Sequence, residues 1–280
     1  MPKPALTALP ATTAAPQVRR NRMQELAHGM STFLLAGGFL AGLTTLFTNP
    51  EAGWPEALLL VLATISTGTA LWRQLPGQNV ILAAVLIGLF GSAASALGVR
   101  TAIPFGPFVF GPDTGPLLFN SIPWLVPLLW FAVILNSRGL ARLILRPWRK
   151  TRTYGLWLIG LTAVSVVALE LALDPFAAHL RHYWIWEETK VPLTWQGAPL
   201  VNFAACAVVA LMILAFTTPA LINKQLSKRS TPDYHPLGVW LGAMIFCGVA
   251  AALHGLWLVV AVDAVLATGA TVFAIRGAKW

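Results

Sequence analysis

Long apolar stretches alternate with short polar ones along most of this chain. The apolar stretches lie at residues 28–48, 55–72, 79–98, 117–136, 154–173, 200–222, 237–254 and 256–275. A helix needs about 17–25 residues to cross a bilayer, so each stretch predicts one span. The last two would be too long for a bilayer of about 30 Å if they were fused, which predicts a tight turn at His254 and Gly255. The pattern predicts an all-α, polytopic membrane bundle of eight helices, or of seven if one segment is re-entrant.

The composition agrees with a membrane protein. Hydrophobic residues make up 57% of the 280 residues and charged residues 10%, whereas about 25% charged residues is usual in soluble domains. We expect residues 23–280 to form a single transmembrane helical domain. Residues 1–22, which are rich in Ala, Thr and Pro, predict a disordered cytoplasmic tail.

The positive charges predict the orientation of the spans. With eight helices, 16 of the 19 Lys and Arg residues fall on the side of the two termini, and Arg100, Arg181 and Lys190 fall on the other. Because Lys and Arg concentrate on the cytoplasmic side, we expect a cell-membrane protein with both termini in the cytoplasm. The net charge of +9 is then a topology signal. Its basic residues flank helices, so membrane lipid is an expected partner and nucleic acid is not.

Two segments on the predicted outer side carry most of the polar and aromatic chemistry, at residues 98–115 and 169–203. In the first, repeated Pro and Gly exclude a regular helix, and non-helical backbone at membrane depth is either buried in protein or lines a cavity. Phe105, Phe108 and Phe110 lie between these helix breakers. They predict an aromatic wall, which suits a hydrocarbon substrate or a loop that folds back into the bundle.

The second segment contains two carboxylates near the end of the fifth span. Glu170 and Asp174 are four residues apart, which puts them on one face of a helix. Carboxylates at this depth are rare and usually functional. Desolvation and mutual repulsion favour a proton on such a pair, which makes a usable general acid. Asp174 followed by Pro175 also predicts the N-cap of a short helix over 176–183, a role compatible with catalysis.

Other polar residues of this segment have ordinary explanations as well as functional ones. Trp184 and Trp186 are typical of the aromatic belt at a membrane interface. His179 and His182 lack a third ligand nearby, so we expect a solvated loop and no metal site. Asn202 can bond a neighbouring helix or orient a water molecule. No phosphate-binding loop, CxxC or GxSxG motif occurs, and no cofactor is indicated.

The order of these motifs resembles the integral-membrane carotenoid biosynthesis family from about the third to the sixth span. The resemblance rests on GVRTAIPFGPFVF, LELALDP, HYWIW and GAPLVNF. The matching positions are Gly98, Thr101, Phe105, Gly106, Glu170, Asp174, Pro175, Trp184, Trp186, Pro199, Asn202 and Phe203. It implies a carotenoid 1,2-hydratase, a hydro-lyase of the γ-carotene or bisanhydrobacterioruberin hydratase type. The chain departs from the family pattern at Ser95, which replaces an acidic residue, at Phe108 and Phe110, which replace tyrosines, and at Glu170, where many relatives have Asp.

Hydration of a terminal alkene needs a proton at C2, a tertiary cation at C1, and attack by water. The resemblance implies the reaction, and for its steps we assign Asp174 as the acid, Glu170 as its partner that also holds the water, and Asn202 as a candidate for orienting that water. Aromatic faces stabilise cations, and the implied substrate-binding residues are Phe105, Phe108, Phe110, Trp184, Trp186 and Phe203. The expected substrate is an acyclic carotenoid end group, and other enzymes of the carotenoid pathway are further candidate partners.

Two other function classes fit the same residues. A non-catalytic subunit that binds carotenoid or lipid needs the aromatic pocket and neither carboxylate. A small-molecule transporter also places carboxylates inside the membrane. Tolerance of both Glu170→Gln and Asp174→Asn would favour the binding subunit.

The charge distribution makes a testable prediction about topology. A membrane-impermeant thiol reagent added from outside should modify a Thr189→Cys variant and should not modify a Ser227→Cys variant. The reverse labelling pattern would contradict the predicted orientation.

Overall fold

The computed structural model describes residues 14–49, 52–187, 193–222 and 231–280. Within these ranges, eight helices are long and apolar enough to cross a membrane. They are α1 (Ala14–Thr48), α2 (Trp54–Trp72), α3 (Gly77–Thr101), α4 (Val126–Ile144), α5 (Tyr154–Asp174), α6 (Leu200–Thr217), α7 (His235–Leu253) and α8 (Trp257–Ala278). The prediction of an all-α, multi-pass membrane protein is confirmed.

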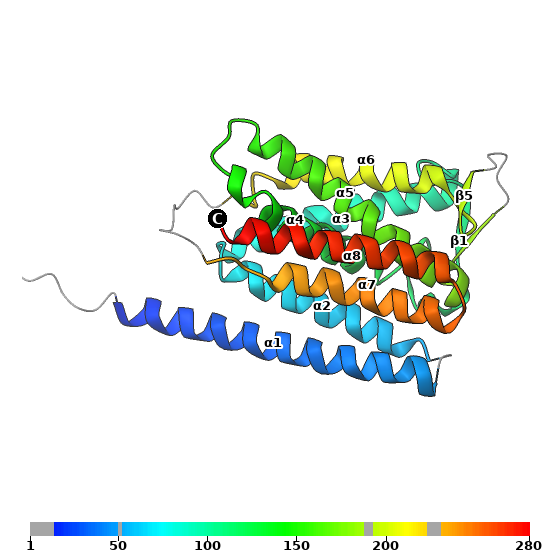
Figure 1. Cartoon of the computed structure of the whole chain (residues 1–280), viewed down its shortest axis with the longest axis horizontal. Helices are drawn as coiled ribbons and strands as arrows, with labels where there is room; N and C mark the ends of the chain where they lie inside the picture. Colours follow the sequence, from blue (N-terminus) through cyan, green and yellow to red (C-terminus); the bar gives the residue numbers. More distant parts are fainter. Residues whose placement is uncertain (1–13, 50–51, 188–192, 223–230) are drawn as a thin grey trace, which may run out of the picture.

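The helices run side by side, so the bundle has two ends (Figure 1). We call the end with the start of α1 and the C-terminus the terminal end, and the opposite one the loop end. The short elements of the loop end are β1 (Phe108–Phe110), η1 (Pro112–Thr114), β2 (Leu117–Leu118), β3 (Ile122–Pro123), η3 (Pro175–Leu180), β4 (Trp184–Trp186), β5 (Thr194–Trp195) and β6 (Ala198–Pro199). One short helix, η2 (Arg146–Trp148), follows α4 at the terminal end.

The first helix begins earlier than predicted. It starts at Ala14, so residues 14–22 are helical where a disordered tail was expected. Alanine and arginine are good helix formers, and Pro16 falls in the first turn, where its missing N–H costs nothing. The rest of the predicted tail, residues 1–13, and the labelling positions Thr189 and Ser227 lie outside the described residues.

The fourth span also differs from the prediction of 117–136. Residues 117–123 form the β2–β3 hairpin, in which Leu117 pairs with Pro123. Phe119 and Asn120 both have a φ of 51°, the left-handed backbone that tight hairpin turns use. Helix α4 then begins at Val126 with a proline in its first turn, a position that proline favours.

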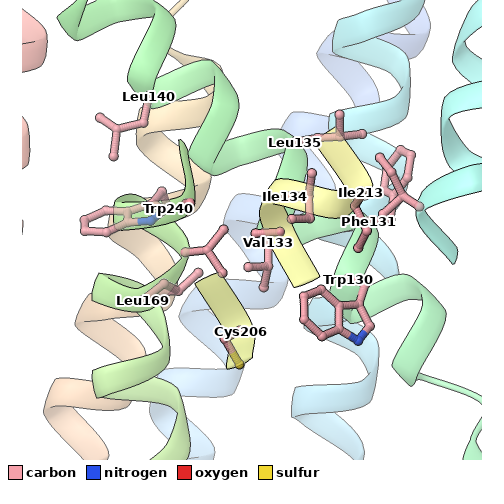
Figure 2. Packing of buried hydrophobic residues seen from close by; sticks show 14 of the residues in the cluster. Trp130, Phe131, Val133, Ile134, Leu135, Leu140, Leu169, Cys206, Ile213 and Trp240 are labelled. Atoms are coloured by element: carbon pink, nitrogen blue, oxygen red, sulfur yellow. The ribbon is translucent and has the colours of Figure 1, made fainter. Parts of the chain in front are cut away.

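Helix α4 lies at the centre of the bundle and contacts α2, α3, α5, α7 and α8. Figure 2 shows Trp130, Val133 and Ile134 of α4 among Leu169, Cys206 and Trp240 from neighbouring helices. Asn136 is almost fully buried and donates from Nδ2 to Thr67 Oγ1 of α2 at 2.9 Å, a contact typical of membrane helix interfaces. Cys206 and Cys247 are both free and buried, as packing residues are.

Helix α1 lies at the edge of the bundle, where it packs along α2 (Figure 1). At the loop end, α7 and α8 are joined by the predicted tight turn, in which Gly255 has a φ of 76°.

The loop end depends on a close backbone approach at Gly111. Its N–H donates to the carbonyl oxygen of Tyr183 at 2.9 Å, and a Cβ at this position would collide with the carbonyl oxygen of His182. We therefore expect Gly111→Ala to lower the free energy of unfolding by about 1–3 kcal/mol, the usual cost of overpacking. Thermal unfolding in detergent measures this effect.

The matched control is Gly155→Ala in the first turn of α5, where nothing lies within 4 Å of an added Cβ. Alanine is a better helix former than glycine, so this variant should unfold at the wild-type temperature or above it. Equal losses in the two variants would contradict the proposed clash.

Candidate functional site

The two polar-aromatic segments pair with each other at the loop end. Strands β1 and β4 are antiparallel, with Phe108 opposite Trp186 and Phe110 opposite Trp184. The ring centroids of Phe108 and Trp186 are 5.3 Å apart, within the range of favourable aromatic contacts. Val109 pairs with Ile185, which lies 76 positions further along the chain. We call the pair of strands β1 and β4 the aromatic ribbon.

The carboxylate of Asp174 lies directly against this ribbon. The side chain is fully buried, with 0% of its surface exposed. Its Oδ1 accepts the indole N–H of Trp184 at 2.7 Å, and the indole N–H of Trp186 lies 3.2 Å from Oδ1 and 3.3 Å from Oδ2. Because an indole nitrogen only donates, this carboxylate fixes the orientation of both rings.

The prediction that Asp174 caps a new helix is wrong. Asp174 has helical backbone angles, with φ −65° and ψ −47°, and its side chain makes no capping hydrogen bond. Helix α5 instead continues directly into the π-helical turn η3. In this turn the N–H of Arg181 donates to the carbonyl oxygen of Phe176 at 3.1 Å. Single π-turns of this kind are frequent at functional sites.

The histidines after Asp174 contact backbone carbonyl groups. The Nε2 atom of His179 bonds the carbonyl oxygen of Gln196, and Nδ1 of His182 lies 3.0 Å from the carbonyl oxygen of Ala178. In the part of the chain that the structure describes, no three His, Cys, Asp or Glu residues gather as a metal site would require.

The other predicted carboxylate, Glu170, is half-buried and faces α6. Its Oε1 accepts the Nδ2 N–H of Asn202 at 3.4 Å, and the Sγ of Cys206 lies 3.7 Å from the other amide atom, Oδ1. Phe105 and Phe203 are both buried in the core, and the ring centroids of Phe105 and Phe108 are 6.3 Å apart. The structure therefore brings the predicted site residues to one region of the loop end.

A cavity of about 1200 Å³ runs beside this region between α1, α2, α4, α5 and α7. Its lining residues on α7 extend from His235 to Cys247, and His254 follows directly after that helix. The 19 residues of α7 correspond to about 28 Å of helix, so the cavity follows the bundle axis. Its walls are mainly aliphatic and aromatic side chains, which include Phe39, Leu129 and Phe176.

The predicted carboxylates do not line the cavity. Leu169 and Leu173 of α5 line it instead, whereas Glu170 of the same helix contacts Asn202 of α6. Of the predicted site residues, Phe110 and Trp184 line the cavity, whereas the others do not. The indole of Trp184 therefore connects the two regions, because it faces the cavity and donates to Asp174.

Several polar residues of the cavity wall were missed by the sequence reasoning, and Asp113, Asn136 and His235 are among them. Glu56, Arg181 and Tyr183 all line the cavity at its loop end. The Oε1 atom of Glu56 pairs with Nη2 of Arg181, and only 11% and 8% of the two side chains is exposed. Glutamate in a first helical turn is ordinary, which hid its importance. The sequence signal that could have found the pair is the position of Glu56 at the outer end of its span, because Arg181 is one of three cations expected on that side.

Comparison with known proteins shows which family the chain matches. A profile described as carotenoid biosynthesis protein matches residues 56–270. The chain is 30% identical over 173 residues to bisanhydrobacterioruberin hydratase of Haloarcula japonica, a match that covers 59% of this chain and 56% of that protein. The chain is thus matched over little more than half the length of this relative. No solved structure matches.

Proposed function

The chain belongs to the carotenoid biosynthesis protein family, and from this membership we propose that it is a carotenoid 1,2-hydratase. The proposed reaction adds water to the terminal C1,2 double bond of an acyclic carotenoid end group and gives a tertiary alcohol. It proceeds by protonation at C2 and attack of water at C1. The similarity to an archaeal bisanhydrobacterioruberin hydratase supports this type of reaction.

The observation that carries the proposal is the long apolar cavity with an aromatic and polar loop end. Ligand pockets commonly measure about 300–1,000 Å³, and this one reaches about 1200 Å³. A polyene can lie along its aliphatic walls with its end group against Trp184 and Phe110. The electron-rich ring faces can stabilise the C1 cation.

We assign Asp174 as the acid and Glu170 as its partner, with Asn202 orienting water. The contact of Asn202 with Glu170 supports a shared role for these two side chains. Asp174 does not line the cavity, whereas Trp184, which donates to it, does. The assignment therefore includes a movement of this indole when the end group binds.

A second candidate is a carotenoid-binding membrane subunit without catalytic activity. The observation that favours it is the complete burial of Asp174 under two indole rings, because a carboxylate can serve there as a structural acceptor alone. In either case we propose that the protein lies in the cell membrane with its terminal end in the cytoplasm. Other carotenoid-pathway enzymes are candidate partners.

The hydratase proposal predicts the source of the product oxygen. Cells that make lycopene or γ-carotene should accumulate a 1-hydroxy carotenoid when they express this protein. In water enriched in heavy oxygen and without molecular oxygen, mass spectrometry should find the label in that hydroxyl group. A requirement for molecular oxygen would indicate a hydroxylase, and unchanged pigments would favour the binding subunit.

The two carboxylates give a separate prediction about catalysis. Asp174→Asn retains an amide oxygen that can accept both indole N–H groups, so the protein should fold, but it cannot act as an acid. We expect wild-type protein levels and a loss of product of about 10²–10⁴-fold, the usual contribution of general acid catalysis. Glu170→Gln should also greatly slow turnover. Wild-type product from both variants would rule out the acid pair and leave Asp263, a buried carboxylate of α8, for testing.

A further inference from the structure

The loop end of the cavity contains a polar cluster that the proposed acid pair does not use. It consists of Glu56 at the start of α2, Arg181 after η3, and Tyr183 before β4. The guanidinium of Arg181 also lies over the ring of Phe176, with Cζ 5.7 Å from the ring centroid. A cation held by both a carboxylate and a ring face has little freedom to move, so it fixes the position of Glu56.

The second carboxylate oxygen of Glu56 is the distinctive atom of this cluster. Oε1 pairs with Arg181, whereas Oε2 is buried and has no hydrogen-bond partner among the described residues. A buried carboxylate oxygen without donors is costly. Since Glu56 lines the cavity, a hydroxyl group or water molecule at the cavity wall would supply the donor that this oxygen lacks.

Tyr183 supplies a hydroxyl group next to this carboxylate. Burial, and secondly the negative charge of Glu56, raise the pKa of the Tyr183 phenol to about 12. The phenol therefore keeps its proton at neutral pH and can donate. Its oxygen lies 3.5 Å from the carbonyl oxygen of Gly53, at the outer limit of a hydrogen bond.

A purely structural role explains only part of these observations. An acidic residue in a first helical turn is favoured by the helix dipole, and the pair with Arg181 joins α2 to the segment after η3. Neither role accounts for the unsatisfied Oε2 of Glu56. Buried ion pairs contribute little net stability, because desolvation offsets their attraction.

We propose that Oε2 of Glu56 binds the water that attacks the substrate and accepts its proton, in place of Asn202, which does not line the cavity. This inference rests on the proposed hydratase function and names a catalytic residue for it. The acid delivers a proton to C2, so that the C2–H bond forms and a tertiary cation remains at C1. The water oxygen then forms the C1–O bond, and its O–H bond breaks as the proton passes to Glu56. No oxidant or reductant is needed.

Hydrogen isotope exchange tests this role apart from that of the acid. Purified Glu56→Gln protein is incubated in D₂O with the acyclic carotene that the wild-type protein hydrates. The proton donor is intact, so the C1 cation still forms but is not captured by water. We expect at least about a 10²-fold loss of hydrated product, the low end of general base catalysis. Recovered substrate should carry deuterium at C2 or a double bond shifted to a C1 methyl group, whereas Asp174→Asn should give neither.

Two further variants separate catalysis from folding. Glu25→Gln breaks an exposed pair with Arg73, whose atoms are 2.9 Å apart, and should leave hydration unchanged. If Glu56→Gln is unstable because Arg181 loses its countercharge, the double variant Glu56→Gln/Arg181→Gln removes both charges. We expect the double variant to recover abundance and to remain inactive.

The possible results distinguish this inference from the proposed function. Hydration by the folded double variant, or by Glu56→Gln at the wild-type rate per folded protein, would overturn the role of Glu56 and leave the hydratase proposal intact. Loss of both hydration and deuterium exchange in folded Glu56→Gln would also overturn it, because Glu56 would then belong to the proton-donating step. Absence of hydration by the wild-type protein would remove both proposals.

Discussion

The arrangement of the loop end depends on one buried carboxylate. A carboxylate in an apolar interior needs donors, and a buried indole N–H needs an acceptor. Asp174 and the rings of Trp184 and Trp186 satisfy each other. The two tryptophans are alternate residues of β4, so their side chains lie on one face of the strand. Asp174 therefore fixes β4, and β4 fixes β1 by pairing.

This constraint explains how irregular backbone is tolerated at the end of a membrane bundle. Non-helical segments near lipid must satisfy their own polar groups. Here β1 and β4 satisfy each other, and the N–H of Gly111 bonds the carbonyl oxygen of Tyr183. The paired strands in turn present Phe110 and Trp184 to the cavity. The end wall of the cavity thus depends on the hydrogen bonds that the loop backbone makes.

The spans could be predicted from the sequence because length and hydropathy decide them, whereas the contacts between loops could not. Residues 117–125 are as apolar as a span, yet Pro116 and Pro123 direct them into a hairpin. The carboxylates and aromatic residues of the candidate site were predictable as intramembrane chemistry. It could not be predicted that the carboxylates do not line the cavity, because strands of three residues carry no signal for their register. The pairing of Glu56 with Arg181, 125 residues apart, is likewise a product of tertiary structure.

The cations of the loop end also need partners, because a charged group near lipid is costly unless it is paired. Few cations occur there, and those that the structure describes are engaged: Arg100 donates to Ser121 Oγ at 2.7 Å, and Arg181 pairs with Glu56. A buried pair of this kind is weak evidence for stability, so its place in the wall of an apolar cavity calls for another explanation. Hydration of an alkene creates a cation beside the attacking water. A carboxylate in the cavity wall that has one oxygen without a donor and is held in place by an arginine is suited to that step, because it can balance the cation and take the proton.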